Sequence, residues 1–214
     1  MQDPAAFVAA QTVLATPPLV PEIRLHLATE ITPLWQATEA RLAESGVAPP
    51  YWAFAWPGGQ AVARHLLDHP ALVAGKRVLD FAAGSGLAAI AAAMAGAARV
   101  EAAEIDALAC AALALNAAAN GVAVACRTAD LVDGPGAWDV VLAGDVCYER
   151  PMAERVMPWL RRLAGRGALV LMGDPGRNYL PASGLAEVAR LVVPTSRELE
   201  DRTERETVIW RVLP

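Results

Sequence analysis

Several features that would narrow a protein's class are scarce or missing in this chain of 214 residues. The three cysteines Cys110, Cys126 and Cys147 are an odd number without a C-x-x-C spacing, a pattern typical of a reducing compartment and not of a metal site. No basic segment followed by an apolar core opens the chain, so no signal peptide is predicted. We therefore expect a cytoplasmic protein.

Metal ligands, membrane spans and excess positive charge are also lacking. His65 and His69 lie four residues apart on an expected helix, but no third ligand stands near them, so no metal site is predicted. The uncharged run 81–98 is mostly alanine and glycine and contains a glycine turn, which argues against a membrane span. A net charge of -5 and a pI of about 5.2 disfavour nucleic acid as the main partner.

What the chain does contain is a strand, turn and helix pattern around Asp80. The apolar run of Val78 and Leu79 ends at Asp80, a small-residue turn with Gly84 and Gly86 follows, and an uncharged helical run covers 87–96. Small residues let the backbone adopt positive φ and approach a ligand, and the helix N-terminus offers unpaired N–H groups. This pattern is typical of a nucleotide-type binding unit.

Two ligands, and a turn without any ligand, compete as interpretations of this pattern. Gly84, Gly86 and Ala89 spell G-x-G-x-x-A, and Glu104 follows about twenty residues later, as in a dinucleotide fingerprint. Asp80 precedes the glycines, however, where an acid would repel a pyrophosphate. It suits the sulfonium and ammonium groups of S-adenosylmethionine, which we predict as the cofactor; a dinucleotide and an unliganded α/β turn are the alternatives.

The remaining periodicity predicts strands alternating with helices. Such alternation indicates an α/β fold with a mostly parallel sheet and helices on both faces. We expect an N-terminal extension over residues 1–48, with a helix in 1–20, a short strand in 21–29 and a helix from 33 to 45. One compact domain over 49–214 follows, including a helix near 180–190, a solvated charged connection at 198–206 and a final strand at 207–213.

Four acids fall at predicted strand ends: Asp80, Glu104, Asp130 and Asp145. Because ligands bind outside the carboxyl ends of parallel strands, their coincidence indicates one pocket. Glu104 can accept both hydroxyls of a ribose. Asp130 can accept the exocyclic amine of an adenine, or it can simply open a turn.

An aromatic segment, residues 49–60, precedes the glycine turn. Its proline and glycine content predicts a loop or a helix entry. The aromatic side chains are either a plug in the core or a lid over a ligand.

A resemblance to a known family rests on the acids and on three short segments. The order of Asp80, the glycines, Glu104 and Asp130 is similar to class I, seven-strand S-adenosylmethionine methyltransferases. Asp145-Val146-Cys147-Tyr148 resembles the D-x-x-Y motif of their protein-lysine branch. The segments P-Y-W-A-F-A-W-P-G-G-Q, G-D-V-C-Y-E and G-D-P-G-R resemble the methyltransferase of electron transfer flavoprotein β-subunit lysines, and the similarity runs from about Pro21 to the C-terminus.

The resemblance implies a Rossmann-like sheet of seven strands and a role for each motif. Asp80, Gly84 and Gly86 would hold the methionine end of the cofactor, and Trp56 would flank it. Glu104 would hold the ribose. Asp145 and Tyr148 would receive the lysine. Ala82 stands where many class members have glycine, which could tighten the cofactor pocket.

The chemistry predicts that Asp145 orients the substrate and that water takes the proton, because a carboxylate favours the charged amine and so opposes its deprotonation. The partner expected from the resemblance is the flavoprotein β subunit. The alternatives are a methyltransferase acting on another protein or a small-molecule amine, and a module that binds the cofactor without catalysis. Enzymes that methylate nucleic-acid amino groups typically carry two prolines where this chain has Val146 and Cys147.

Overall fold

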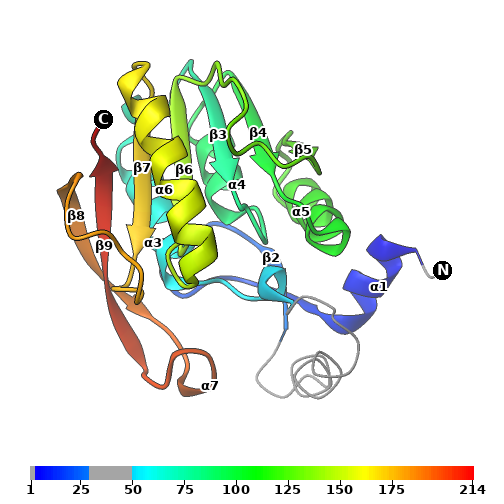
Figure 1. The fold of residues 1–214 in the computed structure, drawn as a ribbon. Helices are drawn as coiled ribbons and strands as arrows, with labels where there is room; N and C mark the ends of the chain where they lie inside the picture. The colour runs from blue at the N-terminus through cyan, green and yellow to red at the C-terminus, as the bar shows by residue number, and fades with distance from the viewer. Residues whose placement is uncertain (1–2, 29–49) are drawn as a thin grey trace.

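A seven-stranded sheet in the order β5-β4-β3-β6-β7-β9-β8 organises the computed structural model, which describes residues 3–28 and 50–214 (Figure 1). Neighbouring strands from β5 to β7 are parallel, and β9 pairs antiparallel with both β7 and β8. This confirms the predicted Rossmann-like sheet. The strands are β3 Arg77–Phe81, β4 Arg99–Ala103, β5 Ala125–Arg127, β6 Val140–Gly144, β7 Leu169–Asp174, β8 Leu185–Pro194 and β9 Glu204–Val212.

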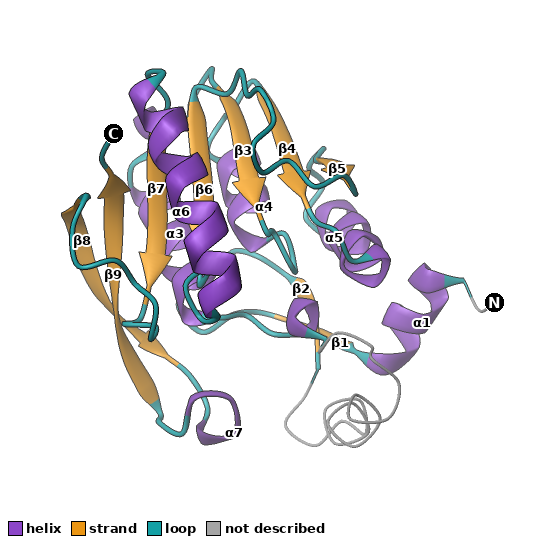
Figure 2. Ribbon diagram, viewed as in Figure 1, coloured by secondary structure: helices purple, strands orange, loops and turns teal. Residues whose placement is uncertain are grey.

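Helices cover both faces of the sheet, with α6 in front and α3 and α4 behind in the view of Figure 2. Alternate residues of the central strands face opposite layers: Val78 packs with the α3–α4 core, and Leu79 packs with the α6 core. Each fully buried side chain of this kind contributes about 1.5–3 kcal/mol. The helices are α3 Pro57–Asp68, α4 Leu87–Met94, α5 Ala107–Ala119 and α6 Arg150–Gly165, with a short turn η2 at Pro70–Leu72.

The N-terminal segment lies near the end of the sheet to which the parallel strands point (Figure 2). It holds α1 Pro4–Gln11, β1 Val13–Ala15, β2 Leu25–Leu27 and, beyond the undescribed part, η1 Tyr51–Ala53. The predicted strand in 21–29 is confirmed as β2. Val13 was expected to be helical; instead it pairs with Leu27 in a two-stranded sheet. The helix predicted for 33–45 and the domain boundary after residue 48 lie outside the described residues.

The C-terminal hairpin differs from the prediction. Residues expected to form a helix near 180–190 lie partly in β8, whose alanine and arginine content is typical of helices. Pairing along β9 outweighs that weak local preference, and Gly184, with φ of 77°, leads into the strand. The short helix α7, Arg197–Glu200, stands in the turn between β8 and β9.

A disulfide joins Cys110 on α5 to Cys126 on β5, whereas the sequence favoured reduced cysteines. The fold places their Cα atoms 6.1 Å apart, within the range that a disulfide spans, and no spacing rule reveals this neighbourhood. Cys147 is free and buried. In the described part of the chain, no helix is long and apolar enough to cross a membrane.

Candidate active site

The turn after β3 brings the backbone into left-handed conformations three times in five residues. The φ values are 52° at Ala82, 50° at Gly84 and 78° at Gly86, and Gly86 is the N-cap of α4. Glycine adopts this region freely, but alanine does so at a cost of about 1 kcal/mol. A glycine at position 82 would therefore adopt this backbone conformation without that cost.

Asp80 lies inside β3 and is 3% exposed. Its Oδ2 accepts a hydrogen bond from the Ala89 nitrogen, 2.9 Å away, in the first turn of α4. Burial raises the pKa of Asp80 to about 8, outweighing the opposing effect of this hydrogen bond, and the charge of Glu104 raises it further. A buried acid with a raised pKa is suited to a cationic ligand that restores its charge.

Glu104 follows β4 and braces the glycine turn. Its Oε2 accepts from the Gly84 nitrogen at 2.9 Å and its Oε1 from the Asp106 nitrogen at 3.1 Å. Asp106 in turn caps α5 by accepting from the Leu108 nitrogen at 2.8 Å. Glu104 therefore meets the turn of Asp80, as predicted from their places at adjacent strand ends.

Asp130 stands apart from this arrangement. Its Oδ1 accepts from the Val132 nitrogen at 3.0 Å, the turn-opening contact that was one of the two interpretations. Its Oδ2 lies 2.6 Å from the Arg155 guanidinium of α6, and its side chain is 47% exposed. Contact with an adenine amine stays a prediction.

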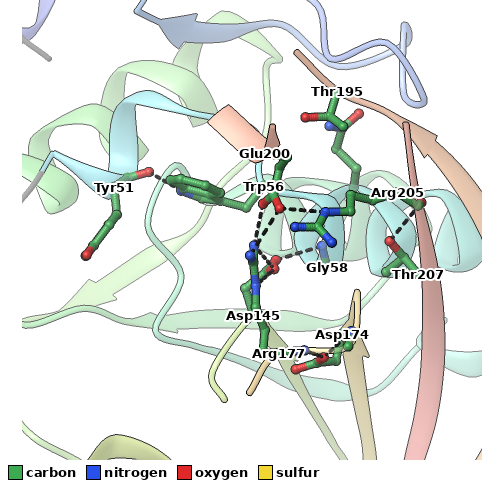
Figure 3. Close-up of polar contacts among 12 residues, drawn as sticks. Tyr51, Trp56, Gly58, Asp145, Asp174, Arg177, Thr195, Glu200, Arg205 and Thr207 are labelled. Carbon is green, nitrogen blue, oxygen red and sulfur yellow. Dashed lines mark hydrogen bonds and ion pairs between the residues drawn. The ribbon is translucent and has the colours of Figure 1, made fainter. Parts of the chain in front are cut away.

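Asp145 follows β6 with φ of 56°, so its side chain turns back toward α3. Its Oδ2 accepts from the Gly58 nitrogen at 2.7 Å, at the N-terminus of α3. Its Oδ1 accepts from Arg177 Nε at 3.0 Å and Nη2 at 2.7 Å (Figure 3). Burial raises the pKa of Asp145 to about 6, and the Arg177 charge limits the rise.

Close packing of glycines makes this contact with α3 possible. Gly144 and Gly173 are cross-strand partners at the ends of β6 and β7. A Cβ on Gly58 would lie 2.7 Å from the Asp145 nitrogen and closer still to the Gly173 oxygen; one on Gly144 would lie 2.8 Å from the Gly59 nitrogen. The W-P-G-G-Q, G-D-V-C-Y-E and G-D-P-G-R segments thus meet at one place.

One residue of the aromatic segment is a core residue, as one of the two interpretations predicted, and a lid over a ligand stays a prediction. Trp52 is 2% exposed and belongs to the core between α1 and α5. Trp56 is partly exposed, donates from Nε1 to the Tyr51 oxygen at 2.8 Å, and faces the Arg177 guanidinium at 5.8 Å. Tyr51 meets Tyr148 edge to face, with ring centroids 5.4 Å apart, which brings the aromatic segment beside the D-x-x-Y motif.

Sequence reasoning missed two residues of the site, Arg177 and Glu200. Arg177 was part of a noted motif, but its partners could not be read from the chain. Glu200 was assigned to a solvated connection; it is instead 3% exposed and accepts from both terminal nitrogens of Arg177 and from Arg205 Nε. Its run of charges is typical of a surface, and only the folding of the hairpin shows that one of them is buried.

His65 and His69 stack with ring centroids 4.4 Å apart. Within residues 3–28 and 50–214, no group of three or more His, Cys, Asp or Glu side chains is placed to hold a metal ion. The described site consists of carboxylates, glycine backbone, aromatic rings and the partly buried Arg177.

Solved structures that share this fold include methyltransferases. Magnesium protoporphyrin IX methyltransferase from Synechocystis, solved with bound S-adenosylmethionine, aligns with a TM-score of 0.56 at 16% identity, covering 87% of this chain and 100% of that one. The ribosomal protein L11 methylase of Lactobacillus delbrueckii aligns with a TM-score of 0.52 at 22% identity, covering 75% and 81%. The family model of ribosomal protein L11 methyltransferase (PrmA) matches residues 65–146. Fold and site define an S-adenosylmethionine-dependent methyltransferase.

Relatives with higher sequence identity show the family within this class to which the chain belongs. The electron transfer flavoprotein beta subunit lysine methyltransferase of Xenopus laevis is 40% identical over 221 residues, covering 99% of this chain and 87% of the relative. The human protein of the same name is 35% identical over 219 residues, covering 98% and 82%. The chain belongs to the family of electron transfer flavoprotein beta subunit lysine methyltransferases.

The residues present fit the cofactor of this family, S-adenosylmethionine. Ala82, Gly84 and Gly86 have left-handed conformations, which let the backbone of the turn approach a ligand. The N-terminus of α4, capped by Gly86, adjoins this turn. Asp80 offers a buried acid and Glu104 an acid already fixed by two backbone N–H groups. A cationic amino acid end and a ribose would find matching partners on adjacent strands.

Proposed function

We propose that the protein transfers methyl groups to lysine side chains of the electron transfer flavoprotein β subunit, the substrate named for its relatives. The observation that carries this proposal is the length of the similarity. The ribosomal-protein family model ends at residue 146, while the flavoprotein methyltransferases align over nearly the whole chain, including Tyr148, Arg177 and the C-terminal hairpin.

In this proposal the cofactor is held by the turn after β3. Asp80 faces the ammonium group, the Gly84 and Gly86 backbone approaches the methionine end, Glu104 binds the ribose, and Trp56 flanks the pocket. When bound, S-adenosylmethionine supplies an electrophilic methyl group on a sulfonium. Asp130 remains a candidate for the adenine amine, provided that its carboxylate keeps an acceptor site beside Arg155.

The substrate lysine enters beside Asp145 and Tyr148. The buried carboxylate accepts a hydrogen bond from the amine and aims its lone pair, while the aromatic rings of Tyr148 and Trp56 favour a cationic or methylated amine over water. Burial raises the pKa of Tyr148 to about 12, so this phenol stays neutral and does not act as the base. The proton released by the amine passes to water.

The proposal is tested with purified flavoprotein β subunit and labelled S-adenosylmethionine, followed by mass spectrometry of the product. Methylated lysine is expected with the native enzyme. Asp145→Asn keeps the size of the side chain and should lower the rate by roughly 100-fold, because orientation of the amine is lost. S-adenosylhomocysteine should still bind this variant in calorimetry. Label confined to RNA or small amines would contradict the proposed substrate.

A further inference from the structure

Asp145, Arg177, Glu200 and Arg205 form one ion-pair cluster. Arg177 lies between two carboxylates, those of Asp145 and Glu200, with side chains 11% and 1% exposed. Arg205 Nε pairs with Oε2 of Glu200 at 2.9 Å. These two acids and two arginines have no net charge among themselves (Figure 3).

Cys147, Tyr148 and Asp174 are other titratable groups near Asp145, and, after burial, the charge of Asp174 also raises the pKa of Asp145. Cys147 stays a neutral thiol, because burial raises its pKa to about 12. Tyr148 is neutral for the same reason. Asp174, from β7, is buried, and its Oδ1 accepts from the Gly176 and Arg177 nitrogens, both at 2.7 Å. Burial raises the pKa of Asp174. Arg177 is therefore the cation in direct contact with Asp145.

Arg177 is placed more firmly than a surface ion pair requires. Asp174 fixes its backbone, and its guanidinium faces the Trp56 ring at 5.8 Å. Two of its nitrogens converge on one oxygen of Asp145. This planar, two-pronged geometry is available to arginine and not to lysine.

Lysine methylation requires that the negative charge of Asp145 is compensated by a cation. The amine attacks only when it is neutral, and an unpaired carboxylate within about 4–6 Å raises the pKa of an amine by roughly 1–3 units. The residue that aims the amine therefore also hinders its deprotonation. A cation bound to that residue removes the hindrance while leaving a lone pair to accept the hydrogen bond.

We propose that Arg177 is a positioning residue of the methyl transfer, which holds Asp145 as a charge-compensated acceptor so that the bound lysine loses its proton near neutral pH. This inference rests on the proposed lysine methylation. Arg177 acts through Asp145 and does not touch the reacting atoms. Glu200 sets how much of the arginine's charge Asp145 receives, which links the C-terminal hairpin to the site.

The test is the pH dependence of kcat, which reports groups in the enzyme–substrate complex. Without the arginine charge in Arg177→Gln, the Asp145 carboxyl and the lysine amine together hold one more proton than in the native complex. The apparent pKa then describes this pair and not either group alone. The rising limb of kcat should move to higher pH by roughly 1–2 units, with a large loss of rate at neutral pH that is partly recovered under alkaline conditions. Arg177→Lys should restore the position of the limb but not the full kcat.

Two further variants separate this role from simple support of the fold. Glu200→Gln leaves the Asp145–Arg177 pair intact and removes the second carboxylate that shares the charge of Arg177. The rising limb of its kcat profile should therefore stay in place or move to lower pH. Arg190→Gln removes an exposed arginine from the ion pairs of the same hairpin and should leave the profile unchanged. A rate loss in Arg177→Gln that is equal at every pH would overturn the proposal.

A readout without turnover guards against misfolding and against a wrong substrate. The pKa of the Asp145 carboxyl, followed by carbon NMR in the substrate-free protein and assigned with Asp145→Asn, should rise in Arg177→Gln and fall in Glu200→Gln. S-adenosylhomocysteine affinity should remain within a few-fold in both variants. If native enzyme fails to methylate the flavoprotein, the proposed function fails; if it succeeds and neither pKa nor profile moves, only the role of Arg177 fails.

Discussion

At the scale of single residues, we expect Asp80 to couple cofactor binding to the release of a proton. Burial raises its pKa to about 8, so the free protein holds this carboxyl mainly protonated at about pH 7. A ligand ammonium favours the carboxylate, and binding should therefore release a proton into the buffer. Calorimetry in two buffers of different ionisation enthalpy should detect close to one proton released at about pH 7 and almost none at about pH 9.

Asp80→Asn provides the control for this release. Asparagine keeps the acceptor for the Ala89 nitrogen but cannot become charged. The variant should bind more weakly and release no proton through this site. Equal proton release by both proteins would assign the effect to another group.

Gly86 supports a prediction about the turn itself. Its φ is 78°, and an added Cβ would lie 2.7 Å from the Leu113 side chain. Gly86→Ala should lower the free energy of unfolding by about 2–4 kcal/mol, from left-handed strain and overpacking together. Gly121 has a φ of 65° with open space around it, so Gly121→Ala should cost only the strain, about 1–2 kcal/mol. Urea unfolding of both variants measures the difference; equal losses would contradict the role of the Leu113 contact.

The sequence predicts the acids at this scale better than their partners. Asp80, Glu104 and Asp145 stand at strand ends, and parallel strands bring those ends together whatever the side chains do. Arg177 reaches Asp145 from the turn after β7, and Glu200 reaches Arg177 only because the β8–β9 hairpin folds back toward that turn. That contact has no periodicity or fixed spacing, so the chain alone does not indicate it.

At the scale of elements, the docking of α3 onto β6 and β7 determines where Asp145 points. Gly58→Ala would place a Cβ against the Gly173 oxygen and the Asp145 carboxylate. The helix must then move, the hydrogen bond to Asp145 is lost, and activity should fall by roughly 100-fold. Gly59→Ala is the matched control, because its Cβ has open space and alanine favours the helix by about 1 kcal/mol.

Methyl transfer and thermal unfolding of the two alanine variants separate these outcomes. Gly58→Ala should lose both activity and stability, whereas Gly59→Ala should keep the activity and gain slightly in melting temperature. Similar activity in the two variants would mean that the contact between α3 and Asp145 is not needed.

The hairpin of β8 and β9 marks the limit of local prediction. Buried parallel strands have continuous apolar runs, and the run that ends at Asp80 predicted the position of β3. β8 lies at the edge of the sheet, and many of its side chains are exposed, so it carries little strand signal. Its pairing with β9 is a long-range effect that intrinsic propensity does not contain.

At the scale of the whole molecule, two regions meet at the carboxyl ends of the strands. The region that matches the ribosomal-protein family model contains the glycine turn, Asp80, Glu104 and Asp145. Later residues supply Tyr148, Arg177 and the hairpin with Glu200. This division is consistent with a shared cofactor region and a family-specific substrate region. Asp145 lies at their junction, where it can align an amine from one side with a methyl group from the other.

Burial of acids at this junction also predicts an unusual pH dependence of stability. The pKa is raised to about 8 at Asp80 and to about 6 at Asp145, both by burial, from 3.8 when the chain is unfolded. Between these values the folded protein binds more protons than the unfolded chain, so the free energy of unfolding falls as pH rises. Substrate-free protein should therefore be more stable near pH 5 than near pH 8, as measured by urea unfolding across that range.

Asp80→Asn assigns the upper part of this slope. Between about pH 4 and about pH 6 the variant should lose stability about half as steeply as the native protein, because only Asp145 still contributes; above about pH 6 it should stay nearly flat while the native protein continues to lose stability up to about pH 8. Saturation with S-adenosylhomocysteine should have a similar effect, because its ammonium group stabilises the ionised Asp80. Stability that rises from pH 5 to pH 8 in the native protein would show that these carboxyls ionise normally, and it would remove the electrostatic basis for the assignment of Asp80 to a cationic ligand.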